Sequence, residues 1–321
     1  MYKICGIALR GRGHIKHNMP CQDKIAYFQS GNLNIIALSD GAGSAKYSHF
    51  GAEKSVKFVC EEFSKNFDGY FNQQDGNVVK SAILSKVRSR MIDLSNEHDC
   101  EISDLAHTLL FVAIKDNNFI LFHIGDGIIG CVKNGQIKVA SLPTNGEFAN
   151  VTVFATSDDA LQNAKIIKGK IDQIEGFVLM SDGSSESFYD KQSKNLTKIL
   201  LKLINLNAIL PSGILQDKLE ISFEKSVLVK TSDDCSLVMI SKAMAFSSLS
   251  IWEQGEILGI KDHKKLQKNI SLLQFLQSKK SVGEIIKFMH LKKRLVKRRL
   301  DDLSNLSLIK RTDAFYEALV S

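Results

Sequence analysis

The chain has 321 residues, of which 44% are hydrophobic and 24% charged, a composition typical of globular proteins. It holds no apolar run of roughly 18 residues, so we expect no membrane-spanning helix, and its first residues lack the apolar stretch of a secretory signal. From residue 243 onward lie 15 of the 42 basic and 8 of the 35 acidic residues, so this tail carries the entire net charge of +7. The asymmetry predicts two units with different partners.

Six cysteines are scattered along the chain and form no CxxC pair. Their spacing therefore does not match a zinc site. A chain of this size has no need of disulfide staples, which are rare in the cytosol, so we expect reduced thiols and a cytoplasmic protein.

The first 242 residues alternate between predicted strands and predicted helices. Apolar runs predict strands over residues 2–9, 24–28, 33–38, 108–115, 118–125, 128–133, 136–140, 176–180 and 235–241. Apolar residues at helical spacing predict helices over residues 52–67, 78–94 and 196–206. Asp116-Asn117 and Asn134-Gly135 are turn signals that join neighbouring strands as hairpins. The predicted fold class is α+β, with helices packed on antiparallel sheets.

Three predicted strands end at an aspartate followed by glycine. The pairs are Asp40-Gly41, Asp126-Gly127 and Asp182-Gly183, and Asp233-Asp234 precedes the last strand. Glycine lets the backbone turn sharply and leaves its carbonyl accessible. Carboxylates and carbonyls that converge at strand ends are the ligands that hard divalent cations prefer. The pattern leaves two interpretations, simple Asp-Gly turns or a metal site.

The order of motifs resembles that of the metal-dependent serine/threonine phosphatases of the type 2C class, most closely a bacterial branch of that family. The resemblance covers about residues 1–242 and rests on six motifs in register. They are Cys21-Gln22-Asp23, Ser39-Asp40-Gly41-Ala42-Gly43, Ala106-His107-Thr108, Gly125-Asp126-Gly127, Ser181-Asp182-Gly183 and Asp233-Asp234-Cys235-Ser236. It implies a layered α-β-β-α sandwich of two antiparallel sheets flanked by helices, and a protein serine/threonine phosphatase activity.

The resemblance also implies a site for two Mn²⁺ or Mg²⁺ ions, with a third ion at Asp126. Asp40 would bridge the two metals, and Asp182 and Asp233 would complete the coordination of one of them. The Gly41 carbonyl, and Asp23 through water, would serve the other. Two cations about 4 Å apart would orient a phosphomonoester and lower the pKa of a bridging water, whose hydroxide then attacks phosphorus in line.

The chain departs from the family pattern at three positions. They are Gln22, where many members have glutamate, Asn18, where animal relatives have a phosphate-binding arginine, and Ala42, where they have a histidine that is a candidate acid. His14, His17 or Arg12 is a candidate to replace the missing phosphate or acid role. The alternative is that these three are solvated loop residues.

The residue pattern of the basic tail predicts a helix, then a helix–turn–helix, then a two-stranded wing. It resembles a winged-helix domain over residues 266–321, joined by a connector at residues 243–265 that contains Trp252. The third predicted helix, over residues 292–304, occupies the position that reads the major groove in such domains. It carries Lys292, Lys293, Arg294, Lys297, Arg298 and Arg299. Three interpretations stay open: DNA binding, binding of a protein partner or autoregulation, and a plain packing module.

The leading hypothesis is a cytoplasmic enzyme that removes phosphate from phosphoserine or phosphothreonine on a protein. The winged helix would direct it to DNA or to a protein partner, such as its substrate or a cognate kinase. The alternative is a DNA-binding regulator whose phosphatase-like part is a sensor or scaffold with little or no activity. Gln22, Asn18 and Ala42 motivate that alternative, and the retained acidic residues argue against it.

Overall fold

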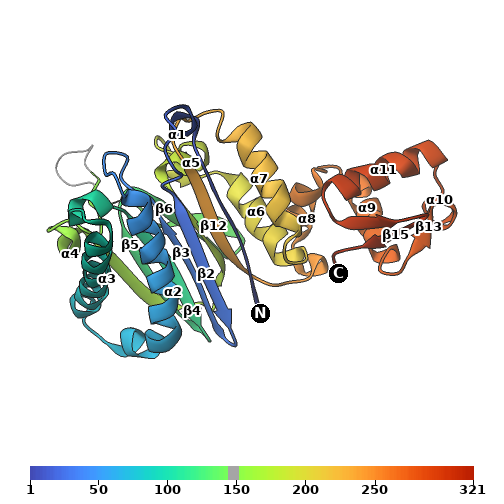
Figure 1. The fold of residues 1–321 in the computed structure, drawn as a ribbon. Helices are drawn as coiled ribbons and strands as arrows, with labels where there is room; N and C mark the ends of the chain where they lie inside the picture. The colour runs from blue at the N-terminus through green and yellow to red at the C-terminus, as the bar shows by residue number, and fades with distance from the viewer. Residues whose placement is uncertain (144–151) are drawn as a thin grey trace.

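The computed structural model describes residues 1–143 and 152–321 and contains two five-stranded sheets packed face to face (Figure 1). The first sheet, in spatial order, consists of β2 (Lys24–Ser30), β3 (Leu33–Ser39), β4 (Leu109–Lys115), β5 (Asn118–Ile124) and β8 (Lys165–Lys170). The second consists of β1 (Tyr2–Leu9), β12 (Cys235–Lys242), β9 (Ile174–Met180), β6 (Ile128–Lys133) and β7 (Gln136–Ser141). All neighbouring strands in both sheets are antiparallel. The predicted α+β class is confirmed.

The central strands are mostly apolar because both of their faces are buried. Along β3, Ile35 and Ala37 pack toward the outer helices, whereas Ile36 and Leu38 pack into the core between the sheets. Side chains alternate between the two faces of a strand, so a strand covered on both sides needs a continuous apolar run. For this reason the positions of these strands could be predicted from the apolar runs in the sequence.

Helices cover the outer face of each sheet (Figure 1). The first sheet is covered by α2 (Ser48–Asn72) and α3 (Gly76–His98), and the second by α6 (Lys198–Ile209) and α7 (Ile214–Ser226). The first pair was predicted, with bounds up to five residues short at each end. The helix predicted over residues 196–206 begins at Lys198, because Leu196 belongs to a short strand. Neither α7 nor β8 was predicted.

Shorter elements connect these layers. They are α1 (Arg12–Lys16), the 3-10 turn η1 (Ile102–Leu105), α4 (Ala160–Asn163), α5 (Asp182–Phe188) and the hairpin of β10 (Tyr189–Asp190) and β11 (Asn195–Leu196). Among the described residues, no helix is long and apolar enough to cross a bilayer.

The last part of the chain is a separate group of elements beside α6 and α8 (Figure 1). It contains α9 (His263–Phe275), β13 (Lys280–Ser281), α10 (Val282–Met289), α11 (Lys293–Asn305), β14 (Ile309–Thr312) and β15 (Phe315–Ala318). The strands form a sheet in the order β13-β15-β14. Ser281 and Glu284 form a capping box that begins α10.

The segment predicted as a connector contains regular structure of its own. It holds the 3-10 turn η2 (Phe246–Ser248) and α8 (Ile251–Leu258), which begins at a Ser250–Glu253 capping box. Buried residues on α8, such as Ile257, belong to one continuous core that runs from the second sheet into the tail. The tail is therefore packed onto the outer helical layer.

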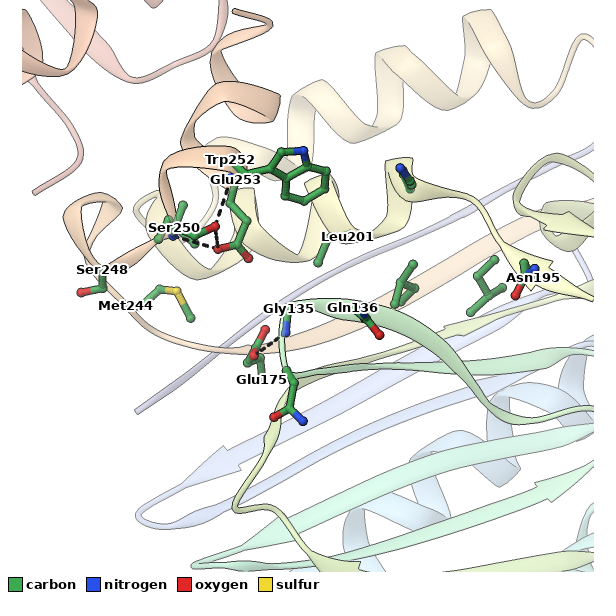
Figure 2. A pocket seen from close by; sticks show the side chains of 15 residues that line it. Gly135, Gln136, Glu175, Asn195, Leu201, Met244, Ser248, Ser250, Trp252 and Glu253 are labelled. Carbon is green, nitrogen blue, oxygen red and sulfur yellow. Dashed lines mark hydrogen bonds between the residues drawn. The ribbon is translucent and has the colours of Figure 1, made fainter. Parts of the chain in front are cut away.

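A cavity of about 910 Å³ lies where α8 meets the turn between β6 and β7 (Figure 2). Figure 2 shows Trp252 on α8 and Glu175 on β9 facing this space, with Glu175 accepting a hydrogen bond from Gly135 N at 2.9 Å. Lys198 of α6 lies with its Nζ 5.8 Å from the centre of the Trp252 ring. The cavity is at the start of β9, whereas the predicted ligand Asp182 follows the end of that strand.

Candidate metal centre

Three aspartates meet at one end of the sandwich, where strands of both sheets end. Asp40 follows β3, Asp126 lies between β5 and β6, and Asp182 begins α5 directly after β9 and Ser181. One carboxylate oxygen from each lies within 4.8 Å of the others. The structure therefore brings together three of the six predicted metal-binding residues. Asp126, which was predicted only for a third metal, belongs to this central group.

The backbone around Asp40 is fixed by Thr108, which directly precedes the neighbouring strand β4. Asp40 N donates to Thr108 Oγ1 at 2.9 Å, and Thr108 N donates to the Asp40 carbonyl at 2.8 Å. Gly125 lies against the same threonine with a φ of +117°, and a Cβ there would come within 2.4 Å of the Thr108 side chain. A residue with a side chain would be strained at this position, so the Gly-Asp motif reflects a local steric requirement.

The crowding of carboxylates raises the proton affinity of Asp40 and of Asp182. Asp40 retains partial access to solvent but is densely surrounded by protein atoms, and this burial, together with the charges of Asp23, Asp182 and Asp126, raises its pKa well above the usual value. Burial, then the charges of Asp126 and Asp233, raise the pKa of Asp182 to about 6. Like charges held together in a buried site destabilise their ionised forms.

Asp23 lies behind this group and is 1% exposed. Burial raises the pKa of its carboxyl to about 7, although the nearby hydroxyls of Ser181 and Ser236 lower it. Within the described residues, neither oxygen of Asp23 makes a well-formed hydrogen bond, and neither does Oδ1 of Asp126. Buried carboxylate oxygens without donors are costly unless a cation neutralises them. An all-oxygen donor set with this deficit fits Mg²⁺ or Mn²⁺.

The two adjacent aspartates before β12 point in different directions. Asp234 is 2% exposed, and its carboxylate accepts Gly11 N at 2.6 Å and Gln22 N at 2.5 Å. Asp233 is exposed, and its carboxylate accepts the backbone N–H of Asp234 at 2.8 Å. Asp233 is outside the group of three, but its charge is among the causes of the raised Asp182 pKa. Asp234 therefore holds the amino-terminal segment, and Asp233 is the one open to a ligand.

The candidates for the phosphate or acid role occupy different positions. His14 lies with Nδ1 2.8 Å from Asp234 Oδ2, on a segment that contacts the loop before β12 through Gly13 N and Ser232 O at 2.7 Å. His17 is exposed, and its Nδ1 lies 2.9 Å from the Gly13 carbonyl. Arg12 donates from Nε and a terminal nitrogen to the Thr231 carbonyl at 3.2 and 3.0 Å. Of these three, His14 is the one whose side chain contacts an aspartate.

Gln22, His107 and His123 are buried and have structural roles. Gln22 is buried, and its amide donates to Ser48 Oγ at 2.8 Å. His107 is fully buried between Ser55 Oγ and the Leu105 carbonyl, each at 2.7 Å. His123 pairs with Ser141 Oγ at 2.7 Å. Burial lowers the pKa of His107 to about 4 and that of His123 to about 3, so both are neutral at pH 7.

Asp126 and Asp182 also line a cavity of about 720 Å³. Lys191 and Lys194, from the turn between β10 and β11, line it too, as does Glu186 of α5. None of these last three residues was predicted as part of the site. Asp190-Lys191-Gln192-Ser193-Lys194 is a turn-like stretch in the sequence, but the sequence pattern does not show which way such a turn faces.

Comparisons with known proteins show which family the chain is similar to. The sequence profile described as Protein phosphatase 2C matches residues 10–211. Serine/threonine-protein phosphatase 3 of Escherichia coli strain K12 is 26% identical over 156 residues, which span 47% of this chain and 61% of that protein. A serine/threonine phosphatase structure from S. agalactiae has a TM-score of 0.52 at 14% identity, covering 75% of this chain and 100% of its own. One from Staphylococcus aureus has a TM-score of 0.50 at 14% identity, covering 76% and 96%.

The structural likenesses show the fold, including two packed sheets flanked by helices. The curated relative is matched over less than two thirds of its length. The family profile, in contrast, covers well over half of the chain and contains five of the six motifs. The chain belongs to the protein phosphatase 2C family.

Proposed function

We propose that this chain hydrolyses phosphoserine or phosphothreonine on protein substrates with the help of Mn²⁺ or Mg²⁺. The observation that carries the proposal is the convergence of Asp40, Asp126 and Asp182, with oxygens within 4.8 Å of one another. Among the described residues, both oxygens of Asp23 and Oδ1 of Asp126 lack a well-formed hydrogen bond, which supports a site that receives cations. The family membership supports the reaction type.

Asp40, Asp126 and Asp182 would hold the cations, assisted by Asp233, by the Gly41 carbonyl and by Asp23. Bound cations would neutralise the phosphate and supply a hydroxide nucleophile at neutral pH. Asp40 is the central ligand because its pKa is raised by the charges of three other aspartates, so it lies among all of them. Asp23 is almost fully buried and would act from behind, through water.

His14 is the proposed partner of the phosphate group or of the leaving oxygen. Asp234 lies beside Nδ1 of His14 and would fix the orientation of the ring, so Nε2 is the nitrogen left for substrate. Arg12 has its guanidinium committed to the Thr231 carbonyl, which disfavours it for this role. His17 is exposed, and its side chain contacts a backbone carbonyl, so it is less suited than His14 to bind the phosphate group or the leaving oxygen.

The direct test is turnover of para-nitrophenyl phosphate and of a phosphothreonine peptide by the full chain. Activity should appear with Mn²⁺ or Mg²⁺, disappear with EDTA and return when the metal is restored. His14→Ala should lower kcat by about 100-fold or more if it acts as an acid, and His17→Ala is its control. Turnover that is insensitive to EDTA would contradict the proposal, and so would no turnover at any metal concentration.

We further propose that residues 266–321 form a winged-helix-like domain that binds DNA through α11. Val296, Leu300 and Leu303 of α11 are buried. Lys292, Lys293, Arg294, Lys297 and Arg298 are exposed, and Arg299 is half-buried. The two sets of side chains leave the charged side of the helix open to an anionic partner.

Duplex DNA binding by the full chain should depend steeply on salt. If about four to six phosphates are contacted, the slope of log K against log salt should be roughly −4 to −5. The triple change Lys293→Gln, Arg294→Gln and Lys297→Gln should reduce the slope by about three. A matched control removes three lysines of α9: Lys264→Gln, Lys265→Gln and Lys268→Gln. Equal loss in both variants would mean non-specific attraction, and no binding at low salt would favour a protein partner.

The proposed location is the cytoplasm. The six cysteines are free thiols, which fits a reducing compartment. Cys5, Cys131 and Cys235 are buried, and burial raises the pKa of each thiol.

A further inference from the structure

The turn between β10 and β11 forms one wall of the cavity that contains Asp126 and Asp182. It is connected to Asp182 by a single short helix, because α5 runs from Asp182 to Phe188 and β10 begins at the next residue. A seven-residue helix is about 10 Å long. The turn therefore lies on the order of 10 Å from the proposed metal ligands.

Local bonds hold this turn in a defined shape. Tyr189 pairs with Leu196, and Asp190 pairs with Asn195. The Asp190 carboxylate accepts Gln192 N at 2.9 Å and Ser193 Oγ at 2.7 Å. Phe188 and Leu196, at the two ends, are buried in the core. The Asp190 carboxylate therefore stabilises the turn through these hydrogen bonds.

Lys191 and Lys194 project from this turn without an acidic partner. Both are exposed, and among the described residues neither takes part in an ion pair within 4.0 Å. The acids that line the same cavity are Asp126, Asp182 and Glu186. The first two belong to the metal site, and Glu186 lies one helical turn from Asp182. The cavity is therefore acidic near the site and basic at the turn.

We propose that Lys191 and Lys194 form a subsite for acidic residues that flank the phosphorylated residue of a protein substrate. This inference rests on the proposed function, which places the phosphate at the acidic cluster. An extended peptide advances about 3.3 Å per residue, so about 10 Å corresponds to roughly three residues. Glutamate or aspartate two to four positions from the phosphoresidue would reach the lysines. Glu186 would repel an acid directly next to the phosphoresidue.

The proposal is tested with two peptides that differ only in flanking charge. One carries phosphothreonine with glutamates two to four residues away on both sides, and the other has glutamines at those positions. At low ionic strength, kcat/KM should be about tenfold higher for the glutamate peptide, mostly through a lower KM, and the ratio should shrink with added salt. Peptides with glutamates on one side alone then show whether the residues before or after the phosphothreonine reach the two lysines.

The double change Lys191→Gln and Lys194→Gln should bring the ratio of kcat/KM values close to one. The matched control, Lys133→Gln with Lys138→Gln, removes the same charge from the β6–β7 hairpin and should keep the ratio at about ten. If the wild type turns over both peptides equally, the lysine subsite is contradicted and the proposed phosphatase function is not. A ratio that survives the double change contradicts the subsite as well. No turnover of either peptide contradicts the proposed function itself.

Discussion

Asp40→Asn is expected to lower kcat/KM for para-nitrophenyl phosphate by about a thousandfold and, without metal, to raise the melting temperature. The catalytic loss follows from the position of Asp40 among Asp23, Asp126 and Asp182. Charge stabilisation by bound metals is worth several kcal/mol, and a loss of about 4 kcal/mol corresponds to roughly a thousandfold in rate. The variant should also lose most of the stabilisation that Mn²⁺ gives the wild type.

The gain in stability follows from the direction of the pKa shifts. Asp40, Asp182 and Asp23 have a higher pKa in the folded protein than in the unfolded chain. Such groups stabilise the fold below the unfolded pKa, and this stability is lost as pH rises through the folded pKa. With Asp182 at about 6 and Asp23 at about 7, the metal-free wild type should lose this contribution between about pH 4 and pH 7. An uncharged amide in place of the Asp40 carboxylate relieves part of the repulsion.

The measurement is thermal unfolding in EDTA from pH 4.5 to 7.5, with wild type and variant side by side. The difference between the two proteins should widen toward neutral pH, and each kcal/mol corresponds to roughly 2–4 °C in a domain of this size. The buried histidines affect the stability of both proteins equally, so the comparison removes their effect. Asp93→Asn, on the exposed side of α3, is the control. A variant that is less stable than wild type at pH 7.5 would show that Asp40 is bound by donors rather than crowded by acids.

The central strands were well predicted from the sequence because a strand that is buried on both faces needs a nearly continuous run of apolar residues. β1 and β6 match their predicted ranges, and β3 extends its range by one residue. In contrast, β8 is an edge strand of six residues, only half-buried, with lysines at both ends and Lys168 within it. Its pattern has little to distinguish it from a loop. Helix α7 buries Leu215, Leu219 and Phe223 at intervals of four residues, a spacing typical of an amphipathic helix.

The candidate site was predictable as a set of residues but not as a geometry. The Asp-Gly motifs identified Asp40, Asp126 and Asp182, because a turn at the end of a buried strand needs both residues. Which carboxylates share a point in space depends on how the two sheets stack, and spacing along the chain does not contain that information. The same holds for Lys191 and Lys194, whose place in the cavity wall depends on the direction in which α5 leaves the second sheet.

The two neighbouring aspartates before β12 should respond to substitution in opposite ways. Asp234→Ala removes the acceptor of Gly11 N and Gln22 N, and it removes the carboxylate that lies 2.8 Å from the His14 ring. Losing a buried carboxylate from such a network costs about 3–5 kcal/mol, because its partners are left without an acceptor. We expect the melting temperature to fall by roughly 6 °C or more. Asp23 directly follows Gln22, whose backbone N–H is bound by Asp234, so we also expect metal-dependent activity to fall in Asp234→Ala.

Asp233→Ala should act on the metal site and leave the fold intact. Asp233 is exposed, and its charge contributes to the raised pKa of Asp182, so removing it should leave the metal-free melting temperature unchanged or slightly higher. The concentration of Mn²⁺ needed for half-maximal activity should rise by about tenfold or more, since a ligand is lost. If Asp234→Ala keeps its stability but loses its metal response while Asp233→Ala keeps both, the ligand is Asp234. The different surroundings of the two carboxylates, one enclosed by backbone donors and one open, argue for Asp233 as the ligand.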